Sequence, residues 1–186
     1  MLAAMPIQAR ADELDEGVRF KSVGLQGNPL GLAIGRYSAD IEYLPEAHHA
    51  LHLTIFGYYA VPGASDQLTG FGGEAGYRLY SGSHGPHGFF VGLSFVTAEL
   101  EYSHLATLAP PADASVDTHF VELGGALDAG YQLIELGNFA VGVGCGAEFI
   151  VDTVQPHFEY QSHPWHDLLY GPGLRPRALL SVGTAF

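Results

Sequence analysis

Charged residues recur at every second position in several alternating segments of this 186-residue chain, and they are the first candidates for chemistry. A carboxylate beside a guanidinium group forms an ion pair, whereas two carboxylates at a suitable separation can act as general acid and base. The charges on the more polar face of their segments are Asp40, Glu42, Glu74, Arg78, Glu122, Asp128, Glu148 and Arg177, with Arg36 as a further candidate partner.

Histidine is the second candidate, because the chain contains ten of them. Imidazoles and carboxylates gathered on loops can bind a transition metal. The largest group is His157, His163 and His166 with Asp152, Glu159 and Asp167, and His104 and His119 flank another polar stretch. Their spacings match no helix or knuckle arrangement that would hold a ligand set, so we expect ordinary surface histidines, no metal site and no cofactor.

Signatures of nucleophilic catalysis are weak. A lipid-modifying barrel enzyme needs a His and a Ser near an acid, but the sequence has no His-x-Ser pair. In Ser83-His84 and Ser103-His104 the two residues are adjacent, and neighbours in an extended chain point to opposite faces. We therefore expect no enzyme activity. Cys145, the only cysteine, cannot form an intramolecular disulfide and is interpreted as a small hydrophobic residue.

The elements that position these side chains are predicted to be strands. Short segments alternate between apolar and polar residues and are separated by Gly, Pro, Asn and Asp, a pattern typical of strands and turns. The eight predicted strands cover residues 21–32, 36–44, 51–59, 69–80, 89–95, 121–132, 139–152 and 176–186.

The composition indicates that these strands cross a membrane. Hydrophobic residues make up 47% of the chain, yet no apolar run approaches the roughly 20 residues of a membrane helix. One face of each strand is apolar and suits lipid, whereas the other is more polar and suits a barrel interior. We expect an all-β fold, an eight-stranded antiparallel up-and-down transmembrane β-barrel in the outer membrane of a Gram-negative envelope. Phe186, at the end of the last strand, is the expected signal to the barrel-assembly machinery.

The lengths of the connections predict an orientation. If Phe186 lies at the periplasmic face, the connections 61–68, 103–117 and 153–174 fall on the outer side and the short turns on the other, which is the usual asymmetry of such barrels. The outer loops are therefore the expected place for an extracellular ligand. An eight-stranded barrel has room inside only for side chains, so we expect the interior charges to pair with one another as a plug.

The amino-terminal residues predict a processed export signal. Ala9-Arg10-Ala11 has the small-x-small form of a cleavage site, so residues 1–11 are interpreted as the end of a signal peptide. Residues 12–20 then form an acidic lead-in, and 21–186 form a single barrel domain. A net charge of −13 argues against nucleic acid as a partner, because phosphate binding depends on clustered cations.

Two pairs of segments carry a family resemblance. Residues 76–80 with 88–92, and 130–133 with 139–144, resemble the Gly-Tyr hairpins of small eight-stranded outer-membrane proteins, the group of the OmpA transmembrane domain and OmpX. The stretch 28–32 with Glu42-Tyr43 is similar to the DUF3575-like barrels. The resemblance covers about 21–186 and implies outer-membrane lipid as a partner, with roles that range from adhesion and anchoring to solute leakage and lipid modification.

Three functions remain open from the sequence. We expect a non-enzymatic barrel that supports the envelope or contacts the surroundings through its outer loops. The alternatives are a lipid-modifying outer-membrane enzyme and a soluble lipocalin-like barrel that binds a small apolar ligand. A soluble barrel would reverse the faces, with apolar residues inside and polar residues outside.

Overall fold

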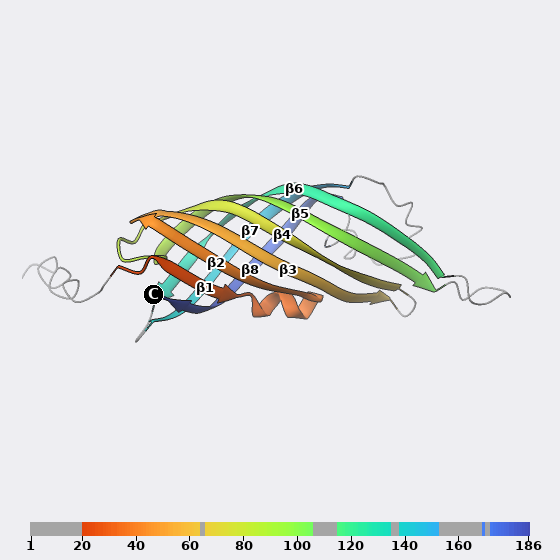
Figure 1. The fold of residues 1–186 in the computed structure, drawn as a ribbon, viewed down its shortest axis with the longest axis horizontal. Coiled ribbons are helices and arrows are strands. Elements are labelled where there is room, and N and C mark those ends of the chain that lie inside the picture. Colours follow the sequence, from red (N-terminus) through yellow and green to blue (C-terminus); the bar gives the residue numbers. More distant parts are fainter. Residues whose placement is uncertain (1–19, 64–65, 106–114, 135–137, 153–168, 170–171) are drawn as a thin grey trace, which may run out of the picture.

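The chain folds into one antiparallel sheet that closes on itself. The computed structural model describes residues 20–63, 66–105, 115–134, 138–152, 169 and 172–186. The elements are β1 (Val23–Gly27), the 3-10 helix η1 (Pro29–Ile34), β2 (Arg36–Glu46), β3 (His49–Gly63), β4 (Asp66–Tyr80), β5 (Gly88–Leu105), β6 (Ser115–Ile134), β7 (Phe139–Asp152) and β8 (Gly173–Ala185). Each strand pairs with the next, and β8 pairs with β1 (Figure 1). The predicted all-β, eight-stranded antiparallel up-and-down barrel is confirmed.

The barrel closes where β1 meets β8. Val23 and Phe186 exchange both backbone hydrogen bonds, at 3.2 and 2.8 Å. The ladder continues from there to Gly27, which lies opposite Val182. We call the end of the barrel that holds Val23 and Phe186 the turn end, and the opposite end, where β3, β5 and β7 finish, the loop end.

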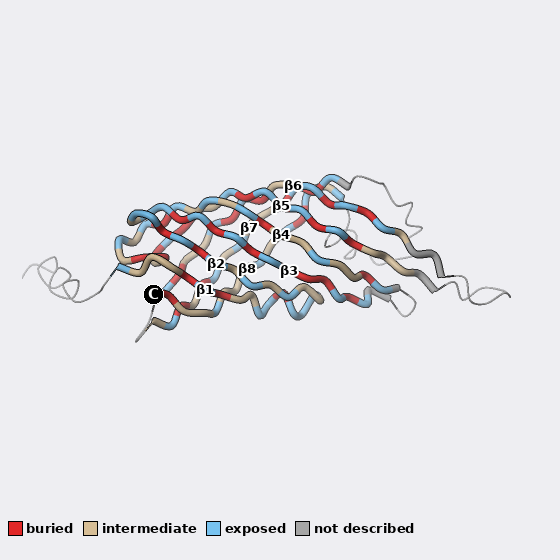
Figure 2. Tube along the Cα trace, in the orientation of Figure 1, coloured by how far each residue is buried: buried red, intermediate tan, exposed pale blue. Residues whose placement is uncertain are grey.

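Alternation along each strand produces two different faces. On β3, Leu53 and Ile55 are exposed, whereas the residues that precede each of them, His52 and Thr54, are buried. The same alternation of buried and exposed residues runs along the other strands (Figure 2). Large apolar side chains occupy the exposed face around the barrel, among them Phe71, Phe89, Leu93, Leu127 and Phe149.

The first predicted strand, 21–32, is wrong in its second half. The strand ends at Gly27, and residues 29–34 turn into η1 instead. Asn28 starts this helix, since its Oδ1 accepts hydrogen bonds from the amides of Leu30 and Gly31 at 3.1 and 3.3 Å. Pro29 cannot donate to a strand ladder but suits the first turn of a helix. Among the described residues, no helix is long and apolar enough to cross a membrane.

Most strands extend further toward the loop end than predicted. β3 and β4 run to Gly63 and from Asp66, β5 and β6 run to Leu105 and from Ser115, and β8 starts at Gly173. The predicted loops 61–68, 103–117 and 153–174 therefore shorten to 64–65, 106–114 and 153–172. At the turn end, the predicted turn 45–49 shortens to 47–48.

These strands are longer than predicted because backbone hydrogen bonding between them continues into segments where the predicted alternation of apolar and polar side chains ends. Glu101 lies opposite His119 in the β5–β6 ladder, although both residues are polar and both belong to the part that reaches furthest at the loop end (Figure 1). The predicted signal-peptide end, 1–11, and residues 12–19 of the acidic lead-in lie outside the described residues.

Apolar side chains fill the interior at both ends of the barrel. Toward the loop end they are Phe56, Tyr58, Ala60, Leu68, Val96, Ala98, Leu100, Phe120, Ala126 and Ile150. Toward the turn end they are Leu44, Ala50, Tyr80 and Phe90. We call these sets the loop-end cluster and the turn-end cluster; buried polar and charged side chains occupy the interior beside and between them.

Candidate functional site: the polar interior

All eight side chains singled out by charge and spacing lie inside the barrel. The most accessible of them, Asp40, exposes 14% of its side chain, and Glu42 exposes none. Because ionised groups persist in a narrow interior only when they are paired, the contacts between these side chains decide what the site can do.

Glu42 is the centre of the group nearest the turn end. Arg78 donates a hydrogen bond to its carboxylate. Gln26 Nε2 donates to Glu42 Oε2 at 3.1 Å. The hydroxyl of Tyr80 lies 2.9 and 3.0 Å from the two carboxylate oxygens and 3.1 Å from Gln132 Oε1, so it can donate to either side chain. Residues of β1, β2 and β4 thus meet at one buried carboxylate, and Tyr80 links this group to Gln132 of β6.

Asp40 extends this group along β2. Thr54 Oγ1 donates to Asp40 Oδ1 at 2.5 Å. Arg78 Nη1 lies 3.5 Å from Asp40 Oδ2, and His52 Nδ1 lies 3.4 Å from Oδ1. Arg78 therefore lies between two carboxylates of the same strand.

Glu74 and Arg177 form a second group. Arg177 donates through both terminal nitrogens to the two oxygens of Glu74, at 3.2 and 2.8 Å. This bidentate arrangement is the strong form of a carboxylate–guanidinium contact. Ser94 Oγ also donates to Glu74 Oε1 at 2.6 Å, and Arg177 Nε lies 3.6 Å from Asp128 Oδ1. The pair joins β4 to β8 across the interior.

Glu122 and Arg175 form a third group, nearer the loop end. Arg175 donates to both oxygens of Glu122, at 3.3 and 2.5 Å. Glu148 links this pair to the rest, since it lies 3.8 Å from Arg175, 3.8 Å from Arg177 and 3.8 Å from Arg36. Each of the four interior arginines consequently has a carboxylate within ion-pair distance.

Arg36 combines a charge contact with an aromatic one. Its guanidinium lies 3.8 Å from Glu74 and 4.0 Å from the ring centroid of Phe56. A cation over the face of an aromatic ring is attracted by the ring's quadrupole. Arg36 therefore joins the ion pairs to the loop-end cluster, which contains Phe56.

Several interior residues were missed from the sequence. Arg175 lies two residues before Arg177 on the same face of β8, but it precedes the predicted start of that strand at 176; extending the alternation by one step would have found it. Gln26 and Ser94, which are uncharged, carry the same period-two signal as the charges. The alternation of residues 69–80 and 121–132 already places Tyr80 and Gln132 on the interior face, where the structure has them.

One prediction about a side-chain pair is wrong. Ser83 and His84 do not point to opposite faces, because the segment is bent rather than extended, and Ser83 Oγ lies 3.2 Å from His84 Nδ1. The two residues lie in the connection between β4 and β5 at the turn end, and Ser83 is exposed. Cys145 is an exposed free cysteine on β7.

Across the described ranges, no cluster of three or more His, Cys, Asp or Glu side chains could hold a metal ion. The histidines at 157, 163 and 166, with Glu159 and Asp167, lie outside the described residues.

Comparisons with known proteins give one result about the fold. No protein-family model matches the chain, and no curated protein matches it. The crystal structure of the N-terminal β-barrel domain of Pseudomonas aeruginosa OprF is similar to it, with a TM-score of 0.53 and 16% sequence identity over 90% of this chain and 98% of that domain. The resemblance to small eight-stranded barrels is thus confirmed for the fold, whereas the DUF3575-like resemblance stays a prediction.

Proposed function

We propose that this protein is a non-enzymatic outer-membrane barrel with a plugged polar interior, which supports the envelope or contacts the surroundings through its outer loops. Outer-membrane lipid and the barrel-assembly machinery are the partners that this role requires. The proposal extends the fold similarity to the N-terminal β-barrel domain of OprF.

The exposed face of the barrel supports the membrane location. Side chains such as Ile55, Phe71 and Leu127 are each about two-thirds exposed, at 65%, 67% and 64%. A continuous belt of exposed apolar side chains is unfavourable in water and favourable in lipid. A soluble lipocalin-like barrel would place the apolar face inside and the charged face outside, opposite to what these residues do.

The ion pairs of the interior arginines are the observation that supports the proposed plug. Arg36, Arg78, Arg175 and Arg177 each lie within 4 Å of a carboxylate, and the apolar clusters lie at the two ends of this ion-pair network. An ion that crossed the barrel would have to break several of these contacts in a medium of low dielectric constant.

Conductance in planar lipid bilayers tests the plug. We expect the refolded protein to give no steady open-channel current, although the same preparation shows the heat-dependent gel shift of a folded barrel. A steady current from the unaltered protein would overturn the plugged interior.

Complementation separates the two roles that we propose. A strain that lacks the gene should be more sensitive to detergent, and the full chain should restore its resistance. If the barrel wall itself supports the envelope, a variant with residues 106–114 replaced by a short Gly-Ser linker should restore resistance equally well. If the loop contacts a partner, this variant should fold but fail to restore resistance. Unchanged sensitivity in the deletion strain would count against an envelope role.

A further inference from the structure

The barrel wall is incomplete between β2 and β8. β1 ends at Gly27 opposite Val182, whereas β8 continues toward the loop end as far as Gly173. Over 173–181, the described residues provide β8 with a strand partner on only one side, β7. In the part of the chain that the structure describes, the wall therefore contains an interval in which the second edge of β8 has no strand beside it.

Pro176 independently marks this open edge. Phe186 directs its backbone groups to β1, and backbone groups along a strand alternate in direction, so the even-numbered residues of β8 face the β1 side. Pro176 belongs to this even series. Proline lacks the amide hydrogen of a ladder and within sheets is confined to edges, strand starts and bulges. Its presence is compatible with the missing strand partner.

The helix η1 covers part of the gap. It lies near both β2 and β8, and Gly31 packs so closely that a Cβ there would come within 2.4 Å of the Arg36 carbonyl oxygen. The outer side of η1 is apolar, since Leu30, Leu32 and Ile34 expose 43%, 63% and 39%.

The gap lies at the depth of the apolar belt. Gly35, at the end of η1, accepts a hydrogen bond from the amide of Tyr59, and Val61, further toward the loop end on β3, is still 61% exposed. On the other side of the gap, Leu174 is 70% exposed. Irregular backbone at membrane depth is tolerated where it is buried in protein or lines a cavity. The exposed side chains of η1, Leu30, Leu32 and Ile34, therefore face lipid, while its backbone lies against β2 and β8 beside the cavity.

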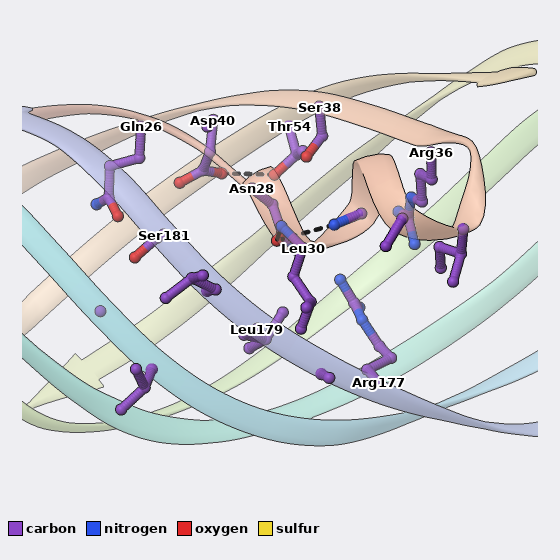
Figure 3. Close-up of a pocket in the computed structure, with 18 of the residues that line it drawn as sticks. Gln26, Asn28, Leu30, Arg36, Ser38, Asp40, Thr54, Arg177, Leu179 and Ser181 are labelled. Atoms are coloured by element: carbon purple, nitrogen blue, oxygen red, sulfur yellow. Dashed lines mark hydrogen bonds between the residues drawn. The ribbon is translucent and has the colours of Figure 1, made fainter.

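A cavity of about 340 Å³ is lined by residues of η1 and of the strands around it, β8 among them (Figure 3). Its lining includes Leu179 and Ser181 from the inner face of β8 and Ala178 and Leu180 from the outer face. Residues of both faces of β8 thus line the cavity beside the open edge of this strand. Its volume is at the lower end of the range of small-molecule pockets, roughly 300–1,000 Å³.

The inner end of the cavity is polar. Arg36, Arg78 and Arg177 line it, and each already lies within ion-pair distance of a carboxylate. An anionic headgroup would have to displace one of these carboxylates, and in the described interior the carboxylates already outnumber the arginines, six to four. Charge complementarity therefore disfavours an anionic headgroup, and the choice of a neutral one rests on the hydrogen-bonding atoms at this end.

A buried polar atom without a hydrogen bond lies at the same end. Gln132 is 1% exposed and its Nε2 has no hydrogen-bond partner within the described part of the chain. Arg177 Nε and Glu148 Oε2 also make no hydrogen bond there, but they lie 3.8 Å from each other, within ion-pair distance. All three side chains line the cavity. A buried donor without a partner is costly, so Gln132 Nε2 favours a ligand that carries an acceptor oxygen, such as a hydroxyl group.

We propose that this cavity binds a neutral, single-chain amphiphile that enters from the lipid phase between η1 and β8. The acyl chain lies against Leu30, Ile34 and Leu179, and a hydroxylated headgroup of the monoacylglycerol class reaches Gln132 and Ser181. The site rests on the proposed membrane location, but it adds a ligand that a plugged barrel does not require.

Photolabelling in lipid nanodiscs tests this site. The probe is a monoacylglycerol with a diazirine in its acyl chain, and peptide mass spectrometry locates the adducts. We expect adducts to concentrate in residues 28–36 and 174–182. Leu179→Trp, which fills the cavity, should lower this labelling roughly tenfold or more, whereas Leu127→Trp on the lipid-facing surface of β6 should not change it. Leu179→Phe serves the same purpose if the Trp variant does not fold.

Competition tests the headgroup. Unlabelled monolauroylglycerol should compete with the probe, and lauroyl lysophosphatidate, which differs from it by a phosphate, should compete much less. Equal competition would overturn the neutral headgroup. Adducts spread evenly around the belt, or labelling unaffected by Leu179→Trp in a folded barrel, would overturn the site. A gel shift on each nanodisc sample reports insertion of the barrel separately, so failure of the proposed function is distinguishable from failure of this inference.

Discussion

The Glu74–Arg177 contact shows what a single residue contributes to this interior. Glu74 exposes 1% of its side chain and Arg177 exposes 9%, and two hydrogen bonds join them. Removing one partner of a buried ion pair leaves the other as an uncompensated charge, which costs more than the pair itself contributes.

Arg177→Met should therefore lower the free energy of unfolding by about 3 kcal/mol. Urea unfolding in lipid vesicles measures this change. Adding Glu74→Gln should recover part of the loss, because it removes the carboxylate that Arg177 holds most closely, whereas Asp128 and Glu148 still lack Arg177. Glu99→Gln on the exposed face should have little effect. Equal stability of the single variant and the unaltered protein would show that Glu74 is not held by Arg177.

At the scale of elements, the seam between β1 and β8 depends on a close approach of two backbones. A Cβ on Gly183 would come within 1.9 Å of the Leu25 carbonyl oxygen and 2.7 Å of the Gln26 Cα. A Cβ on Gly73, also in a strand, would meet nothing closer than 3.6 Å, the Thr54 carbonyl oxygen. The two glycines thus differ in the space around them rather than in their secondary structure.

Gly183→Ala should weaken closure of the barrel, whereas Gly73→Ala should be tolerated. The fraction of refolded protein that migrates as the compact species on an unheated gel measures closure. We expect this fraction to fall for Gly183→Ala alone, since the side chain would push β8 away from β1. Similar fractions for both variants would contradict the tight seam.

The last strand also carries the expected assembly signal. Phe186 is 55% exposed at the turn end, and Phe139 on β7 is 50% exposed at the same end. Phe186→Ser should reduce the folded protein in outer-membrane fractions more than Phe139→Ser does, if recognition by the assembly machinery depends on the residue at 186. Equal losses would assign the effect to exposed aromatic rings in general.

At the scale of the whole molecule, the two ends of the barrel define an orientation that can be measured. Gln67 is exposed on β4 toward the loop end, and Ser83 is exposed at the turn end. If the loop end faces outward, a membrane-impermeant maleimide should label Gln67→Cys in intact cells but label Ser83→Cys only after lysis. Both variants carry Cys145→Ala to remove the native thiol. The reverse labelling pattern would invert the orientation.

Much of this fold could be predicted because the relevant signals are local. Alternation along β3, from Leu51 to Tyr59, assigns each side chain to a face without reference to any other strand. The same period places Glu42 and Glu148 inside. The prediction failed at 28–32, where the cap formed by Asn28 and the proline after it outweighed an apolar pattern that suits a strand.

The sequence by itself determined the number of strands, their two faces and the charged character of the interior, because these follow from a two-residue period within each strand. Only the tertiary structure decided that Arg177 meets Glu74, about a hundred residues away, since partners across a barrel depend on closure and on the register of every intervening strand. The tertiary structure also decided that β1 is shorter than its neighbours, and this places the gap in the wall beside β8. Such a gap exists only after β1 and β8, which are distant in sequence, are brought together.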